Sequence, residues 1–170
     1  MSRINSPAEL EEFRKNILSE RDPNKPCITL CAGSACIATG SGDVGLSLEA
    51  ELVKQGLRDK VDLRRTGCHG FCERGPMIII HPEEISYFQV QPKDAAEIIS
   101  ETIKEKKIIK RLLYTDPDTK EKIVKESEIP FYKHQERLVF GSNGSIDPKS
   151  IDDYLAIGGY AALQKALYDM

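Results

Sequence analysis

The chain has 170 residues, of which 40% are hydrophobic and 30% charged, and its formal net charge is −3. This composition is ordinary for a soluble globular protein with room for one domain of about 100 residues plus appendages. The slightly acidic balance argues against the basic surface of a nucleic-acid-binding protein. No run reaches the roughly 20 apolar residues of a membrane span, and the first residues lack the apolar core of a secretory signal. We therefore expect no membrane insertion and a cytoplasmic location.

The first part of the chain alternates predicted helices and strands. Ser6-Pro7-Ala8-Glu9 fits a capping box with proline at the first helical position, which predicts a short amphipathic helix within residues 1–25. The domain expected at 26–106 has strands at 27–31, 61–65, 77–80 and 85–90, a helix from Asp43 to Gly56, and a helix from Pro92 through Ile103. This order predicts an α/β fold, a thioredoxin-like two-layer domain with a mixed sheet and helices. Both cysteine loops leave the C-terminal ends of strands, so these ends can lie side by side.

The composition changes from about residue 107, where lysines become dense and the glycine-rich loops stop. A turn at 115–119 lies between two short apolar pieces, which predicts a hairpin or an extended linker over 107–147. Further predicted elements are a short strand at 137–140, a helix from Asp147-Pro148 through Leu155, and another helix from Tyr160. Residues 148–170 are expected to be the start of a second domain.

Five cysteines in a cytoplasmic protein indicate metal or redox chemistry, because reducing thiol pools keep such cysteines out of disulfides. Four of them follow the pattern C-x4-C-x31-C-x3-C: Cys31, Cys36, Cys68 and Cys72. Four thiolates can hold a zinc ion or an iron–sulfur cluster. The gaps are wider than the two-residue gaps typical of structural zinc sites, and glycines surround them. We therefore favour a [2Fe-2S] cluster and keep a zinc-stabilised structural or interaction module as the alternative.

The remaining candidate residues favour plainer interpretations. Cys27 begins a strand outside the glycine loops, which is typical of a buried free cysteine. His69 follows Cys68 directly and is expected to be a surface loop histidine. The sequence contains no C-x-x-C and no phosphate-binding loop, which disfavours a dithiol oxidoreductase or a nucleotide enzyme. We expect no catalytic residue in this segment.

The cysteine pattern resembles that of a known family. T-G-C-H-G-F-C-E-R-G-P at 66–76, followed by M-I-I-I-H-P, is similar to the thioredoxin-like [2Fe-2S] ferredoxins, which include the 24-kDa-type subunit of complex I. The resemblance covers about residues 25–106. It implies that the cluster ligands are Cys31, Cys36, Cys68 and Cys72, and that Cys27 matches none of the family's ligand positions.

A second resemblance covers the C-terminal part. E-R-L-V-F-G-S-N-G-S-I-D-P and I-D-D-Y-L-A-I-G-G-Y-A-A-L-Q-K-A at 136–166 are similar to the opening of the NADH-binding flavin subunit family. That family includes the 51-kDa-like subunit of complex I and the beta subunit of NAD-linked, electron-bifurcating [FeFe]-hydrogenases. The resemblance implies a longer subunit whose FMN and NAD(H) sites lie downstream of Met170.

Together the resemblances imply electron transfer through a [2Fe-2S] cluster within a multi-subunit NAD(P)H-linked oxidoreductase of the hydrogenase or NADH dehydrogenase type. The implied partners are other redox subunits of a soluble complex, such as a 24-kDa-like ferredoxin subunit and an iron–sulfur hydrogenase or dehydrogenase subunit. A homodimer is a further option.

Overall fold

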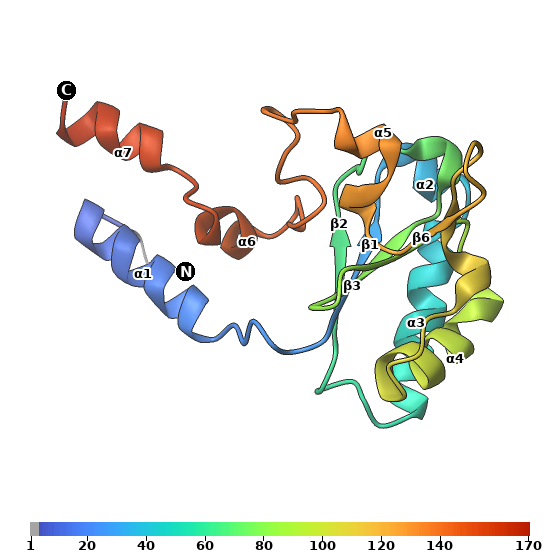
Figure 1. Cartoon of the computed structure of the whole chain (residues 1–170). Helices are drawn as coiled ribbons and strands as arrows, with labels where there is room; N and C mark the ends of the chain where they lie inside the picture. Colours follow the sequence, from blue (N-terminus) through green and yellow to red (C-terminus); the bar gives the residue numbers. More distant parts are fainter. Residues whose placement is uncertain (1–3) are drawn as a thin grey trace.

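The structure is a computed structural model that describes residues 4–170. Its central feature is a four-stranded mixed sheet of order β2-β1-β3-β4 (Figure 1). The strands are β1 (Cys27–Cys31), β2 (Asp62–Thr66), β3 (Ile78–His81) and β4 (Ile85–Tyr87). β1 pairs in parallel with β2 and antiparallel with β3, which in turn pairs antiparallel with β4. The predicted α/β class with a mixed sheet is confirmed, as is the predicted succession of strands and helices along the chain.

Helices pack on one face of this sheet (Figure 1). They are α3 (Ser41–Lys54) and a continuous helical segment made of η2 (Pro92–Asp94), α4 (Ala95–Glu97) and η3 (Ile98–Lys104), the last with π-helical hydrogen bonding. Because side chains alternate along a strand, every second residue of β1 and β3 points to these helices. The buried core on this side contains Ile28, Leu30, Leu48, Ile78, Ile80, Ile98 and Ile99.

The opposite face of the sheet is covered by residues that follow the predicted domain. These residues form the hairpin of β5 (Tyr114–Thr115) and β6 (Lys122–Ile123), η5 (Glu126–Glu128) and α5 (Pro130–Lys133). The short helix η4 (Lys110–Leu112) before them still packs in the first core, through Leu112. A second buried cluster lies beneath them and contains Cys31, Cys36, Met77, Ile79, Phe88, Tyr114 and Ile129. Two of the cysteines of the predicted site therefore belong to a core that the segment after residue 107 helps to close.

The two ends of the chain lie together on one side of the sheet domain (Figure 1). Helix α1 (Pro7–Ser19) packs beside α6 (Ile151–Ala156), and α7 (Ala161–Tyr168) follows. The guanidinium of Arg14 joins the first two, since it donates to the carbonyl oxygens of Leu155 (2.9 Å) and Gly159 (3.2 Å). The N-terminal helix is thus held by the C-terminal segment.

Two local expectations need correction. The strand predicted at 137–140 is wrong: these residues form turns, and Leu138 and Val139 are 86% and 85% exposed. A short strand needs the hydrogen bonds of a neighbour, and in the described part of the chain no strand pairs with this segment. The first cysteine loop also contains a short helix, α2 (Ser34–Ala38), that the glycine-rich sequence concealed.

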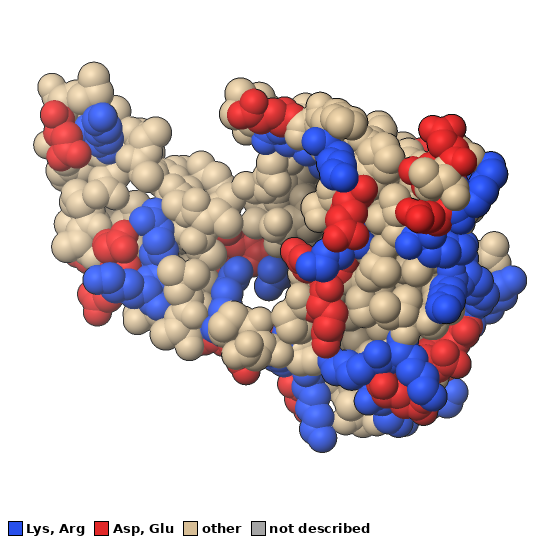
Figure 2. Space-filling model, in the orientation of Figure 1, with Lys and Arg blue, Asp and Glu red and all other residues tan. Residues whose placement is uncertain are grey.

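The surface in Figure 2 mixes the two signs of charge. Lysines and arginines lie among aspartates and glutamates rather than in one basic stripe. No helix within residues 4–170 combines the length and apolarity that crossing a membrane requires.

Candidate metal centre

The parallel pairing of β1 and β2 brings the two cysteine loops to one edge of the sheet. Cys31 is the last residue of β1 and lies in register with Thr66, the last residue of β2. The main chain continues this contact, since the N–H of Ala32 donates to the carbonyl of Thr66 (2.9 Å). The loops that begin at these two residues therefore start side by side, as the order of elements predicted.

The first loop holds two buried thiols. Cys31 is 1% exposed, and Cys36, on α2, is 2% exposed. A hydrogen bond between the two side chains lowers the pKa of Cys31 to about 5, and the backbone N–H groups of His69 and Gly33 contribute to this lowering. The same hydrogen bond, together with burial, raises the pKa of Cys36. The pair thus keeps one proton between two sulfurs, which favours a thiolate inside the core.

The second loop holds the more accessible thiols. Cys68 is half-buried and Cys72 is exposed, with their sulfur atoms 3.8 Å apart. The N–H of Gly70 donates to the sulfur of Cys68 (3.3 Å), and Gly70 has a φ of +89°, which only glycine adopts without strain. The hydrogen bond to Cys68 raises the pKa of Cys72.

The two loops contact each other through glycines. A Cβ on Gly33 would lie 2.9 Å from the Cβ of Cys68, and a Cβ on Gly75 would lie 2.6 Å from the sulfur of Cys36. Charge on Cys68 or Cys72 raises the pKa of Cys36, so the sulfurs of both loops share one electrostatic environment. Because Gly33 and Gly75 have no side chain, there is room between the loops for the cysteine sulfurs and for a metal group bound to them.

The four thiols form two pairs rather than one tight ring. Within residues 4–170, no group of three or more His, Cys, Asp or Glu side chains converges closely enough to hold a single metal ion. A donor set of two adjacent thiol pairs, one buried and one at the surface, fits a group with two metal atoms. In such a cluster each iron takes two cysteine sulfurs.

His69 is not the surface loop histidine that the sequence predicted. The residue is only 1% exposed, with Nε2 3.1 Å from the hydroxyl of Thr66 and Nδ1 3.0 Å from a carboxylate oxygen of Glu126. Glu126 follows 57 residues later in a segment that folds back over the loop. No pattern in the sequence around His69 predicts its contact with Glu126.

Cys27 lies at the other end of β1 from Cys31, with Asp62 and His81 as its neighbours in register. It is half-buried, and burial raises the pKa of its thiol. A raised pKa makes a thiol less reactive and a poorer metal ligand. Its place in the sheet agrees with the plain structural role that the sequence indicated.

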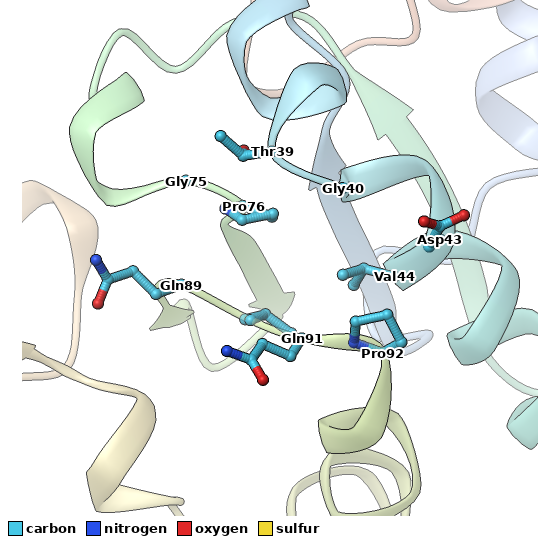
Figure 3. Close-up of a pocket in the computed structure, with 10 residues that line it drawn as sticks. Thr39, Gly40, Asp43, Val44, Gly75, Pro76, Gln89, Gln91 and Pro92 are labelled. Carbon is cyan, nitrogen blue, oxygen red and sulfur yellow. The ribbon is translucent and has the colours of Figure 1, made fainter.

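A pocket of about 600 Å³ has Gly75 in its wall (Figure 3). Its lining is Thr39, Gly40, Asp43, Val44, Gly75, Pro76, Gln89, Val90, Gln91 and Pro92. None of the four cysteines contributes to this lining, and its polar groups are amides, one hydroxyl and one carboxylate. The candidate metal centre is therefore separate from it.

Comparison with known proteins agrees with this geometry. A model of the family described as thioredoxin-like [2Fe-2S] ferredoxin matches residues 13–103. A protein named "Ferredoxin, 2Fe-2S" from Clostridium pasteurianum is 31% identical over 77 residues, which are 45% of this chain and 76% of that protein. A protein of the same name from Aquifex aeolicus is 35% identical over 48 residues, which are 28% of this chain and 43% of the relative.

Solved structures agree in fold. The crystal structure of the wild-type thioredoxin-like [2Fe-2S] ferredoxin from Aquifex aeolicus has a TM-score of 0.50 and 23% identity. The match covers 54% of this chain and 97% of that one. The C-terminal segment that covers the second cysteine loop lies outside residues 13–103. The sheet, the paired cysteine loops and the family match together place this chain in the thioredoxin-like [2Fe-2S] ferredoxin family.

Proposed function

We propose that the chain is a one-electron carrier in which Cys31, Cys36, Cys68 and Cys72 hold a [2Fe-2S] cluster. The observation that carries this proposal is the meeting of two thiol pairs at adjoining ends of the parallel strands β1 and β2. Membership of a family named for this cluster supports the same assignment. The low pKa of Cys31 suits it further, because the thiolate is the ligand form.

The chain's own residues have distinct parts in this function. A bound [2Fe-2S] cluster supplies the uptake and release of one electron. Cys31 and Cys36 hold their side of the site in a core that excludes water, whereas Cys72 lies at the surface. We therefore expect electrons to enter and leave on the exposed side of the site, next to Cys68 and Cys72. No side chain is needed as acid, base or nucleophile.

The wider setting of the protein is a further part of the proposal. Residues 136–166 resemble the opening of an NADH-binding flavin subunit, and Arg137 and Asn143 of this stretch lie against the second cysteine loop. This contact supports a carrier that passes electrons within an NAD(P)H-linked complex, with FMN and NAD(H) bound outside this segment. Other redox subunits are the proposed partners, in the cytoplasm.

Metal analysis tests the cluster. Anaerobically purified protein is expected to contain about two irons and two acid-labile sulfides per chain and to lose its brown colour with dithionite. Cys36→Ser should lose both, while Cys27→Ser should keep both. A colourless protein with one zinc and no sulfide, after expression with iron supplied, would contradict electron transfer and support the zinc-stabilised module.

NADH reduction tests the setting. The complex purified anaerobically from its source is expected to show cluster reduction when NADH is added, and the isolated chain of 170 residues is not. A complex that contains this chain but no flavin, and that NADH leaves oxidised, would contradict the NAD(P)H-linked setting without affecting the cluster.

A further inference from the structure

The peptide group between His69 and Gly70 contacts a sulfur of the candidate metal centre. Its N–H, which belongs to Gly70, donates to the sulfur of Cys68 at 3.3 Å. Hydrogen bonds from backbone amides to cysteine sulfurs stabilise the more negative, reduced form of an iron–sulfur cluster and so raise its potential. The position of this peptide group therefore bears on the redox properties of the site.

The glycines of the loop around His69 restrict its backbone little. Gly67 and Gly70 flank the segment, and the carbonyl of Arg74, beyond Cys72, accepts from the N–H of Gln89 at 3.0 Å. A glycine-rich stretch of this kind has many accessible backbone conformations, and fixing one costs conformational entropy. Contacts of its side chains and carbonyl groups must therefore select the conformation in which the Gly70 N–H reaches Cys68.

The covering segment, residues 126–144, supplies these contacts. The carboxylate of Glu126 hydrogen-bonds Nδ1 of His69 (3.0 Å), and the guanidinium of Arg137 donates to the carbonyl oxygen of His69. The ring of Phe131 stacks on Phe71, two residues further along the loop, with 4.4 Å between centroids and 7° between planes. The covering segment thus contacts the side chain and the carbonyl of His69 and the turn that follows it.

Close approach of the covering segment depends on glycines. A Cβ on Gly67 would meet the carbonyl oxygen of Asn143 at 3.1 Å, and a Cβ on Gly144 would meet the His69 ring at 2.8 Å. The covering segment lies beyond residues 13–103, the part that matches the family. It is therefore an addition of this chain to the ferredoxin domain, fitted to the second cysteine loop.

We propose that Glu126, through the imidazole of His69, is a positioning residue that holds the Gly70 N–H on the sulfur of Cys68 and thereby raises the potential of the centre. Arg137 assists from the carbonyl side of the same residue. The effect on potential rests on the proposed cluster, whereas the positioning itself is a property of the polypeptide. Two measurements separate these parts.

The variants are Glu126→Ala and Glu126→Gln in the full chain, with Glu128→Ala as control. Glu128 lies on the same short helix, η5, and is exposed, so its removal changes the charge nearby without touching His69. Glu126→Gln removes the same charge as Glu126→Ala but retains a group that hydrogen-bonds the imidazole. The comparison of Ala with Gln at position 126 therefore isolates the contact from the charge.

Amide hydrogen exchange of the metal-free chain tests the positioning. We expect exchange across residues 67–71 to be about threefold to tenfold faster in Glu126→Ala than in Glu126→Gln, because one hydrogen bond of typical net strength is lost. Glu128→Ala should exchange as the unchanged chain does. Equal exchange in the Ala and Gln variants at position 126 would overturn the proposal.

The midpoint potential of the reconstituted chain tests the consequence. The midpoint potential of Glu126→Ala is expected to be more negative than that of Glu126→Gln. The difference corresponds to an equilibrium constant for reduction that is about threefold to tenfold smaller, and tenfold equals about 59 mV for one electron. Equal potentials in these two variants would overturn the claim on the centre. A chain that assembles no cluster would overturn the proposed function itself, while the exchange experiment would still decide the role of Glu126.

Discussion

Asp153 on α6 forms an ion pair with Arg21, which follows α1, at 2.5 Å between carboxylate and guanidinium. The same carboxylate lies 3.5 Å from Nε of Arg64 on β2 and accepts a hydrogen bond from the N–H of Asp147 (2.7 Å). One buried acidic side chain therefore connects the N-terminal helix, the edge strand of the sheet and the C-terminal segment. These three parts are far apart in the sequence.

Removal of the charge at Asp153 should loosen the two ends of the chain. We expect Asp153→Asn to destabilise the contact between α1 and α6 by about 1.5–3 kcal/mol, the usual range for hydrogen bonds to a charged group. Amide exchange in residues 147–157 measures this effect. Asp152→Asn, on the exposed side of the same helix, is the matched control and should change little. Equal protection in the two variants would contradict a connecting role for Asp153.

Ile129 tests whether the segment after residue 107 is an integral part of the ferredoxin domain. Its side chain is fully buried, in the cluster that also contains Cys31 and Cys36. Ile129→Ala is expected to lower the free energy of unfolding by about 2–4 kcal/mol, since it removes buried methyl groups and leaves a cavity. Urea denaturation followed by circular dichroism gives the value. Ile157→Ala, at a side chain that is 50% exposed, should cost far less; similar losses at the two positions would argue for a freely tethered segment.

Local patterns were sufficient to predict the sheet and the pairing of the cysteine loops. The β-branched run at 77–80 and the alternation at 61–65 specify strands wherever they are placed, because both depend on side chains close in sequence. Cys31 and Thr66 become neighbours because a crossover helix between two strands makes them parallel. The positions of Cys31, Cys36, Cys68 and Cys72 in this edge follow from the same rule.

The environment of the second cysteine loop could not be predicted in this way. The burial of His69 depends on Glu126, and the position of the Phe71 ring depends on stacking with Phe131. Each partner is more than 50 residues away in the sequence. The sequence at 137–140 reads as a strand, but its backbone has no strand neighbour among the described residues and forms turns instead. Long-range packing decides these features, and neither hydrophobic periodicity nor capping signals report it.

Gly75 should be intolerant of a side chain because of the sulfur beside it. A Cβ at this position would lie 2.6 Å from the sulfur of Cys36, well inside van der Waals contact. We expect Gly75→Ala to displace that sulfur and to reduce the iron and sulfide retained per chain after anaerobic purification. Gly42→Ala is the control, since a Cβ there meets no atom within 4 Å on helix α3. The control should retain its metal and gain about 0.5–1 kcal/mol of stability. Full metal content in Gly75→Ala would show that the loop can shift without losing its ligand geometry.

The stability of the chain should depend on pH through His81. Burial lowers the pKa of this histidine, so the folded protein keeps it neutral at a pH where the unfolded chain already binds a proton. By linkage, the free energy of unfolding is then highest above the ordinary histidine pKa of about 6.5 and falls as the pH decreases from there toward the lowered pKa. His81→Gln should reduce this decrease.

Urea denaturation from about pH 8 to pH 5 measures the slope for the metal-free chain. His134→Gln, at an exposed position after α5, serves as the control because it removes a histidine without changing a buried one. The other ionisable groups are common to all three proteins, so the difference in slope reports the substituted histidine. A His81→Gln variant that loses stability with acid as steeply as the unchanged chain would show that the half-buried imidazole at the end of β3 does not set the acid sensitivity.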